Sequence, residues 1–503
     1  MEQQLGHYIL FGFQVALQPI NLLYCFLGVT IGTLIGILPG IGPAATIALM
    51  LPTTYTVSPV SAVIMLAGIY YGAMYGGSTT SILVNIPGEA ASVVTVLDGY
   101  QMARQGRAGA ALGISAFGSF IGGSITIVAM MLLAPPLANV ALKFGPPEYF
   151  SLIILGFMLL TYLSAGSMIK ALMMAAVGII IASIGMDEIT GACRFCYQIQ
   201  ALYEGVGLVP VIIGLFGVSE VFINLDEEVK QRSLVATKVK NLLPNREDWK
   251  KSIGPILRGS VIGFALGIIP GGGTIISSFA AYVVEKRLSK TPEKFGTGMI
   301  EGVAGPETAN NAACSGSLIP LLTLGIPSNV VMLIIIGALM IHGVQPGPLL
   351  IKESPEIFWG VVTSMYLGNA MLLILNLPLI GLWVRILRVP YKILFPLILL
   401  FCLIGAFSTE GKTSDTLVVI IFGVVGYLLK KFDYEPAPLI FALVLGPMFE
   451  NAFQQSLLMS NGKFGIFLTR PISAAFILVA AAMLIMALLT KSPPGKDLGK
   501  EKA

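Results

Sequence analysis

The sequence predicts an all-α polytopic membrane protein, and three observations support this prediction. Of the 503 residues, 55% are hydrophobic and 11% are charged, whereas a soluble protein carries about 25% charged residues. The mean hydropathy is +0.86. Apolar stretches long enough to cross a bilayer recur from about residue 20 to residue 490, with glycine and proline inside them, as is common in membrane helices. These features exclude an ordinary soluble protein.

The first apolar segment is expected to remain in the mature chain. The opening residues, MEQQLGHYILFGF, lack the basic region and the small-residue cleavage site of a signal peptide. The net charge of +4 is small and dispersed, so nucleic-acid binding is not expected. Cys193 and Cys196 form a single CxxC pair, and without a second pair or a nearby histidine they predict no zinc site.

A repeat relates the two halves of the chain. The segment GVTIGTLIGILPGIG starts at Gly28, and GSVIGFALGIIPGGG starts at Gly259, an offset of 231 in the numbering. Their matching glycines and prolines predict, in each half, a closely packed GxxxGxxxG helix that breaks at a Pro-Gly pair. In a looser match, at an offset of 240, Pro87 of GGSTTSILVNIPG corresponds to Pro327 of GSLIPLLTLGIPSN. The chain is therefore expected to contain two related halves.

The distribution of lysine and arginine predicts that these halves are inserted upside down relative to each other. The stretch between them carries seven basic residues, which predicts a cytoplasmic location under the positive-inside rule. In the corresponding loops of the two halves, the basic residues alternate between halves, as inverted repeats require. We expect about 11–12 membrane segments in two inverted repeats with broken or re-entrant helices.

Four regions and a membrane orientation follow from this arrangement. The regions are a first inverted repeat with flanking spans at 1–225, a cytoplasmic linker at 226–252, a second inverted repeat with flanking spans at 253–490 and a cytoplasmic tail at 491–503. The N-terminus is expected outside and the C-terminus inside. The loops expected on the external side are 134–150, 187–205, 342–357, 408–414 and 450–470.

The two Pro-Gly breaks are the candidate site of function. Segments 20–51 and 254–285 each leave and return on one side of the membrane, either as a re-entrant hairpin or as two short spans. Irregular backbone at membrane depth is tolerated only inside protein or beside a watery cavity. Paired breaks in inverted repeats typically mark the binding site of a transporter. The helices that begin after them direct partial positive charge at an anion.

Polar residues beside the breaks complete this candidate site, because hydroxyl and amide groups donate to carboxylates and their oxygens coordinate Na⁺. The candidate substrate- or ion-binding residues are Pro39, Gly40, Gly42, Ser78, Thr79, Thr80, Ser81, Asn85, Pro270, Gly271, Gly272, Gly273, Thr274, Glu307, Asn310, Asn311 and Ser315. A sodium ion is expected near Thr79, Asn85, Asn310 and Ser315, and Glu307 is the candidate ion-coupling carboxylate. Glu89 and Asp98 are expected at solvated span ends.

A simpler interpretation remains for each of these groups. The glycines then serve only close helix packing, and each hydroxyl bonds to its own helix. The PGIGP and PGGGT loops lack the GK[ST] ending of a P-loop, and no nucleophile, base or metal set converges, so neither an ATP-driven pump nor an enzyme is expected. Two hypotheses remain: a secondary transporter with alternating access, and a gated anion channel in which the broken helices line a pore.

Four stretches resemble the large membrane subunit of the tripartite tricarboxylate transporter family. They are GILPGIGPAATIALMLPTTY, YYGAMYGGSTTSILVNIPGEAASVVTVLDGYQMARQGRAG, GIIPGGGTIISSFAAYVVEK and EGVAGPETANNAACSGSLIPLLTLGIPSN. The resemblance implies a bacterial inner-membrane permease that imports citrate or related organic carboxylates by Na⁺ or H⁺ symport without another cofactor, and in such a membrane the external N-terminus would be periplasmic. It also implies two partners, a small membrane subunit of about four spans and a periplasmic solute-binding protein.

Overall fold

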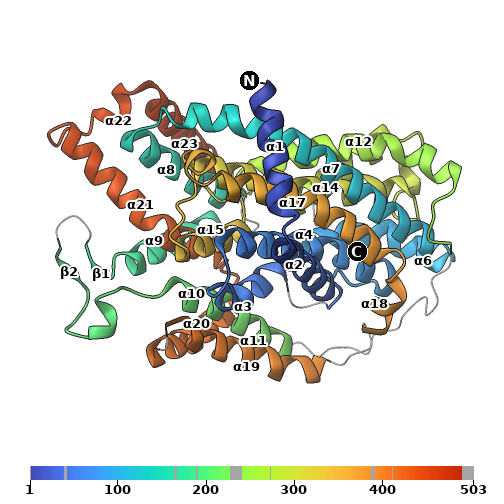
Figure 1. Ribbon diagram of the computed structural model, residues 1–503, viewed down its shortest axis with the longest axis horizontal. Helices are drawn as coiled ribbons and strands as arrows, with labels where there is room; N and C mark the ends of the chain where they lie inside the picture. Colours follow the sequence, from blue (N-terminus) through green and yellow to red (C-terminus); the bar gives the residue numbers. More distant parts are fainter. Residues whose placement is uncertain are drawn as a thin grey trace.

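The computed structural model describes residues 2–38, 42–163, 167–187, 191–226, 241–271, 273–386, 391–410 and 412–489, and these ranges are almost entirely helical (Figure 1). Six helices among them are long and apolar enough to cross a membrane. They are α2 (Pro19–Ile37), α4 (Pro59–Val84), α7 (Ala108–Ala141), α17 (Pro355–Asn376), α20 (Thr413–Lys431) and α21 (Ala437–Met459). The all-α polytopic class is therefore confirmed.

The first repeat is built around the broken pair α2 and α3 (Pro43–Thr54), followed by α4. Helix α4 ends at Asn85, which adopts a left-handed conformation with φ of 62°. The chain then passes through short helical pieces to reach α7. These pieces are η1 (Ala90–Ser92), α5 (Val93–Thr95), the π-helical η2 (Val96–Tyr100) and α6 (Gln101–Arg104).

The second repeat follows the same plan. Helix α12 (Arg246–Ile268) breaks before α13 (Gly273–Leu288), and α14 (Glu301–Leu324) follows after η5 (Pro292–Lys294). Helix α14 ends at Gly325 in the left-handed conformation, and Gly325 is the counterpart of Asn85 at the offset of 240. The remaining pieces are α15 (Val330–Ile341), α16 (Leu350–Glu353) and α17. The looser of the two sequence matches thus corresponds to the same helix ending in both halves.

Close glycine packing repeats in both halves. Helix α2 packs along α4, and α12 packs along α14 in the same way. At each glycine of the GxxxGxxxG pattern, an added Cβ atom would clash with a backbone carbonyl oxygen of the neighbouring helix. The pairs are Gly28 with Met65, Gly32 with Ile69 and Gly36 with Ala73, and then Gly259 with Gly305, Gly263 with Ala309 and Gly267 with Ala313. Every partner in the second repeat matches its first-repeat counterpart at the offset of 240.

Corresponding positions of the two repeats lie at opposite ends of α7, as inverted repeats require. Gln105, just before α7, donates a hydrogen bond of 2.6 Å to the carbonyl of Thr297. Its counterpart at the same offset, Gln345, lines a cavity with Gly145, just after the end of α7. A helix of this length spans roughly 50 Å. These equivalent positions of the two repeats therefore lie at opposite ends of the helix bundle.

Two outer layers combine helices from both halves. In the first, α8 (Pro146–Leu163) and α9 (Met168–Ala182) pack against α21 and α23 (Pro471–Leu489). In the second, α10 (Leu208–Ile212), π-helical η4 (Ile213–Val218) and α11 (Ser219–Asp226) pack against α20 and α19 (Tyr391–Glu410). Figure 1 shows these layers at the left and at the bottom of the view. The remaining helices are α1 (Glu2–Ala16), α18 (Ile380–Ile386), α22 (Ile466–Thr469) and η3 (Gln200–Leu202).

Two helix boundaries differ from the sequence prediction, and the structure adds detail to one expected loop. Helix α7 continues to Ala141 through Pro135 and Pro136, beyond the start expected for the external loop. Helix α12 begins at Arg246, inside the segment assigned to the linker, because Asn245 and Asp248 form a reciprocal capping box there. In the expected external loop 187–205, strand β2 (Cys193–Arg194) pairs with β1 (Gly185–Met186), and a disulfide joins Cys193 to Cys196.

Candidate functional site

Helices α4 and α14 form the centre of the protein. The most apolar stretch of α4 is 94% buried, whereas that of α20 is only 22% buried. Residues 302–323 of α14 are all buried as well. A membrane helix that is enclosed by other helices does not contact lipid. It can therefore carry polar side chains without exposing them to hydrocarbon. The polar clusters of the two repeats lie on these two helices.

Glu307 of α14 joins the two repeats. The residue is 1% exposed. The hydroxyl groups of Ser78 and Thr95 contact its two oxygens, and the Ser115 hydroxyl donates to it at 3.2 Å. All three hydroxyls belong to the first repeat. The clusters that the sequence places beside the two breaks are thus in direct contact through this one acid, and Thr95 and Ser115 are partners that the sequence analysis did not include.

Two further hydrogen bonds between the repeats are related by the repeat itself. The side-chain amide of Asn310 donates to Glu89 at 3.3 Å, and that of Asn329 donates to the hydroxyl of Tyr70 at 3.1 Å. Position 310 corresponds to 70, and position 329 corresponds to 89, both at the offset of 240. Glu89 and Asn329 each also accept a hydrogen bond from a backbone N–H group as the N-cap of the helical segment that follows. The interface between α4 and α14 therefore has approximate two-fold symmetry.

Two acids that were expected at solvated span ends are buried instead. Glu89 is 8% exposed, and Asp98 is 0% exposed. The expectation was wrong because the segment 86–104 folds into short helical pieces that pack against α4, α13 and α14 rather than emerging from the protein. The largely apolar run at 93–97 is too short to span a membrane, so the sequence alone does not show that it packs inside the protein.

The other candidate residues of α4 and α14 differ in what they contact. Thr80 and Ser81 donate to backbone carbonyls of Ile37 and Ser92, respectively, so they hold neighbouring segments together. Ser315 donates to the carbonyl of Asn311 in its own helix. Thr79 is buried beside Ser78, whereas Asn85 is exposed at the end of α4. The structure therefore brings Ser78, Glu307, Asn310 and Asn311 together and leaves Asn85 outside this contact.

The residues of the breaks lie at the starts of α3 and α13. Gly42 caps α3, and Gly273 begins α13 with φ of 49°. The Gly271 amide donates to the carbonyl of Ser328 at 2.8 Å, which joins the break to the turn after α14. Pro270 is half-buried, and Thr274 is buried at the first turn of α13. Pro39, Gly40 and Gly272 lie outside the described residues.

Comparison with known proteins supports the resemblance seen in the sequence. Residues 22–441 match the model of the "Tripartite tricarboxylate transporter TctA family". The chain belongs to this family. A relative from Agrobacterium vitis, named "Uncharacterized 52.8 kDa protein in TAR-I ttuC' 3'region", is 51% identical over 97% of each chain. A second, "Uncharacterized protein in TAR-II ttuC' 3'region", is 49% identical over 47% of this chain and 97% of its own length. No solved structure matches.

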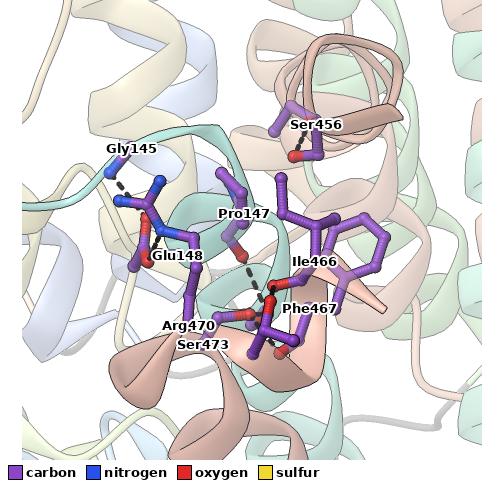
Figure 2. Close-up of polar contacts among 11 residues, drawn as sticks. Gly145, Pro147, Glu148, Ser456, Ile466, Phe467, Arg470 and Ser473 are labelled. Carbon is purple, nitrogen blue, oxygen red and sulfur yellow. Dashed lines mark hydrogen bonds and ion pairs between the residues drawn. The ribbon is translucent and has the colours of Figure 1, made fainter. Parts of the chain in front are cut away.

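In this TctA-family chain, a cavity of about 420 Å³ lies at the end of α7 far from Gln105. Residues of three separate segments line it, around Tyr149 in α8, Gln345 after α15 and Asn451 in α21. All three belong to segments that the positive-inside rule assigns to the external side. Beside it, the buried carboxylate of Glu148 accepts hydrogen bonds from Arg470 Nε at 2.6 Å and from the Gly145 amide at 2.8 Å (Figure 2). This ion pair joins the start of α8 to the start of α23.

Proposed function

We propose that the chain is the membrane permease subunit of a binding-protein-dependent secondary transporter, which imports citrate or related organic carboxylates by cation symport with alternating access. One observation carries this proposal. The two repeats meet across a buried polar cluster on α4 and α14, and the contacts between them follow the repeat symmetry. Transporters built from inverted repeats place their sites at such an interface and alternate by moving one unit against the other.

The chemistry of the cluster suits a carboxylate that travels with cations. Hydroxyl and amide groups of the cluster, together with the N-terminal ends of α3 and α13, supply hydrogen-bond donors. Among the described residues, the ion pairs formed by Lys and Arg all involve acids other than Glu89 and Glu307. The negative charge of the substrate must then be balanced by cations that bind with it.

An energy balance sets the number of these cations. Concentrating a dianion about 100-fold against a potential of about 100 mV, inside negative, costs roughly 7.4 kcal/mol. One Na⁺ that enters down a tenfold gradient and the same potential supplies about 3.7 kcal/mol. Import of a dianion to this extent therefore requires at least about two cations for each substrate molecule. A one-to-one stoichiometry with strong accumulation would contradict this balance.

The proposed setting is a bacterial inner membrane, with the N-terminus in the periplasm and the C-terminus in the cytoplasm. The proposed partners are a small membrane subunit and a periplasmic solute-binding protein that delivers the substrate. Two observations support this orientation. Three segments assigned to the external side converge on one cavity, and the Cys193–Cys196 disulfide lies in a fourth such segment, as expected in an oxidising compartment.

The test is uptake of labelled citrate into proteoliposomes that contain the chain and its small subunit, with and without the binding protein. Na⁺ and proton gradients are imposed separately. We expect accumulation that requires the binding protein and one of the two gradients. Equilibration without accumulation would favour the gated anion channel, because a channel cannot concentrate its substrate. Accumulation of another carboxylate, but not citrate, would change the substrate and keep the mechanism.

A further inference from the structure

The carboxyl group of Glu307 has no opposite charge beside it among the described residues. Its hydrogen-bond partners are the hydroxyls of Ser78, Thr95 and Ser115, which are neutral. A buried carboxylate surrounded by neutral groups is strongly destabilised unless it binds a cation or a proton. The shell of hydroxyls suits a cation, since their oxygens remain available as ligands while their protons point at the acid.

A second carboxyl group, that of Glu89, contacts α14 through Asn310, close to Glu307. Glu89 accepts hydrogen bonds from the Ala91 amide at 2.8 Å and from Asn310 at 3.3 Å. Asn310 follows Glu307 by one helical turn, so both residues lie on one face of α14. No ion pair with Glu89 occurs within the described ranges. One acid from each repeat therefore lies beside Asn310.

The side-chain oxygen of Asn310 is buried and has no hydrogen-bond donor in the described structure. Its orientation follows from its neighbour, because rotating the amide would place two oxygens, its own and that of Glu89, against each other. The carboxylate groups of a substrate offer only acceptor oxygens, so they cannot satisfy this group. A cation can satisfy it, and a monovalent cation would also balance one of the two negative charges of the acids.

The pseudo-symmetric position in the first repeat does not carry this arrangement. Ala67 corresponds to Glu307, and Tyr70 corresponds to Asn310, at the offset of 240. Tyr70 is buried, and its hydroxyl accepts the Asn329 hydrogen bond. At the approximate two-fold interface, the buried acid of α14 and the unpartnered oxygen of Asn310 therefore have no counterpart at the corresponding positions of α4.

We propose that the coupling ion is sodium and that it binds among Glu89, Glu307 and Asn310, between the two repeats. This inference rests on the proposed transport function and assigns to it a position for the cation. One Na⁺ held between an acid from each repeat offsets one of their two negative charges, which reduces their repulsion and stabilises their contact. It would leave the interface as the repeats separate. Oxygen ligands of this kind suit a hard cation.

The test measures Na⁺ binding to the purified full-length protein without any substrate. Radioactive ²²Na⁺ binding and the melting temperature are recorded in NaCl and in choline chloride at equal ionic strength. We expect saturable binding and a melting temperature that rises with Na⁺, because a ligand of the native state stabilises it. Asn310→Ala and Glu307→Gln should weaken Na⁺ binding by about 10- to 100-fold.

Tyr70→Phe is the matched control, because it removes the symmetry-related hydrogen bond to Asn329 and leaves the proposed ligands in place. It should retain wild-type Na⁺ affinity. Glu307→Asp covers the case in which the glutamine variant does not fold, and it should bind Na⁺ more weakly while keeping the charge. Wild-type Na⁺ affinity in folded Asn310→Ala, or a melting temperature that responds to pH and not to Na⁺, would overturn the sodium site.

These outcomes are independent of the proposed function. Carboxylate accumulation driven by a proton gradient alone, without Na⁺ binding, would remove the sodium site and keep the transporter. Saturable Na⁺ binding in a protein that accumulates no carboxylate under any gradient would keep the sodium site and contradict the transport function.

Discussion

The carboxylate of Asp98, in the first repeat, accepts a hydrogen bond of 2.9 Å from the hydroxyl of Tyr282 in the second repeat. It also accepts backbone hydrogen bonds of 2.8–2.9 Å from Gly296, Gly298 and Met299. These contacts fasten η2 to the loop before α14, at the end of the bundle where Gln105 meets Thr297. The two repeats are therefore held together on the side expected to face the cytoplasm, while the cavity lies at the other end of α7.

Replacing Asp98 with alanine should destabilise the protein. The change leaves three backbone N–H groups and the Tyr282 hydroxyl without their acceptor, and we expect a loss of about 2–3 kcal/mol in the free energy of unfolding. Tyr282→Phe removes one hydrogen bond and should cost about 1 kcal/mol. Thermal unfolding in detergent measures both changes. An Asp98→Ala protein with the wild-type melting temperature would show that the contact contributes nothing.

Thr79→Ala and Asn310→Ala should each reduce carboxylate uptake by more than about tenfold, which corresponds to about 1.4 kcal/mol. Both side chains are buried on the helices where the repeats meet. Uptake into proteoliposomes is the measurement, with the amount of inserted protein determined in parallel. Wild-type uptake by both variants would move the substrate site away from this interface.

Gly32→Val and Gly263→Val should destabilise the protein to a similar extent, because they occupy corresponding positions. A Cβ atom at either one would clash with a backbone carbonyl, of Ile69 or of Ala309. We expect a loss of about 3 kcal/mol or more for each, seen as a lower melting temperature or as aggregation during purification. Gly6→Val is the control, since an added Cβ there meets no atom within 4 Å. Tolerance of valine at only one of the paired positions would contradict equal packing of the repeats.

Arg470→Ala should destabilise the contact between the starts of α8 and α23, beside the cavity. The Glu148 side chain is 3% exposed and that of Arg470 is 38% exposed, so the variant leaves a buried carboxylate unpaired while solvent screens part of the original attraction. We expect a loss of about 2–3 kcal/mol, less than a fully buried pair would cost. The double variant Glu148→Ala/Arg470→Ala should lose less than the sum of the two single variants. Strict additivity in this double-mutant cycle would exclude an interaction between the two side chains.

Cys193 and Cys196 should resist alkylation until they are reduced. Cys193 is exposed in the β1–β2 hairpin, and the cysteines outside this pair are buried. A membrane-impermeant maleimide applied to intact spheroplasts should therefore label the protein only after an impermeant reductant. Mass spectrometry of the labelled peptide identifies the site. Labelling before reduction would show free thiols, and labelling only in inside-out vesicles would reverse the proposed orientation.

Much of the architecture follows from local sequence patterns. Composition and apolar segment length predicted an all-α membrane protein, because a bilayer admits only a few ways of satisfying backbone polar groups. The GxxxGxxxG pattern predicted close packing, since only glycine permits the approach seen between Gly32 and Ile69. Glu307 was recognised as a candidate because a charged residue is costly in an otherwise apolar segment.

The tertiary structure decided which polar groups meet. Thr95 and Ser115 contact Glu307 across 212 and 192 residues, and no local pattern connects positions so far apart. The burial of Glu89 and Asp98 likewise depends on how segment 86–104 packs between the repeats. The sequence by itself determined the class, the repeat and the positions of the breaks, because these depend on periodicity and composition. The pairing of side chains depends on how one repeat is oriented against the other, which only the folded chain establishes.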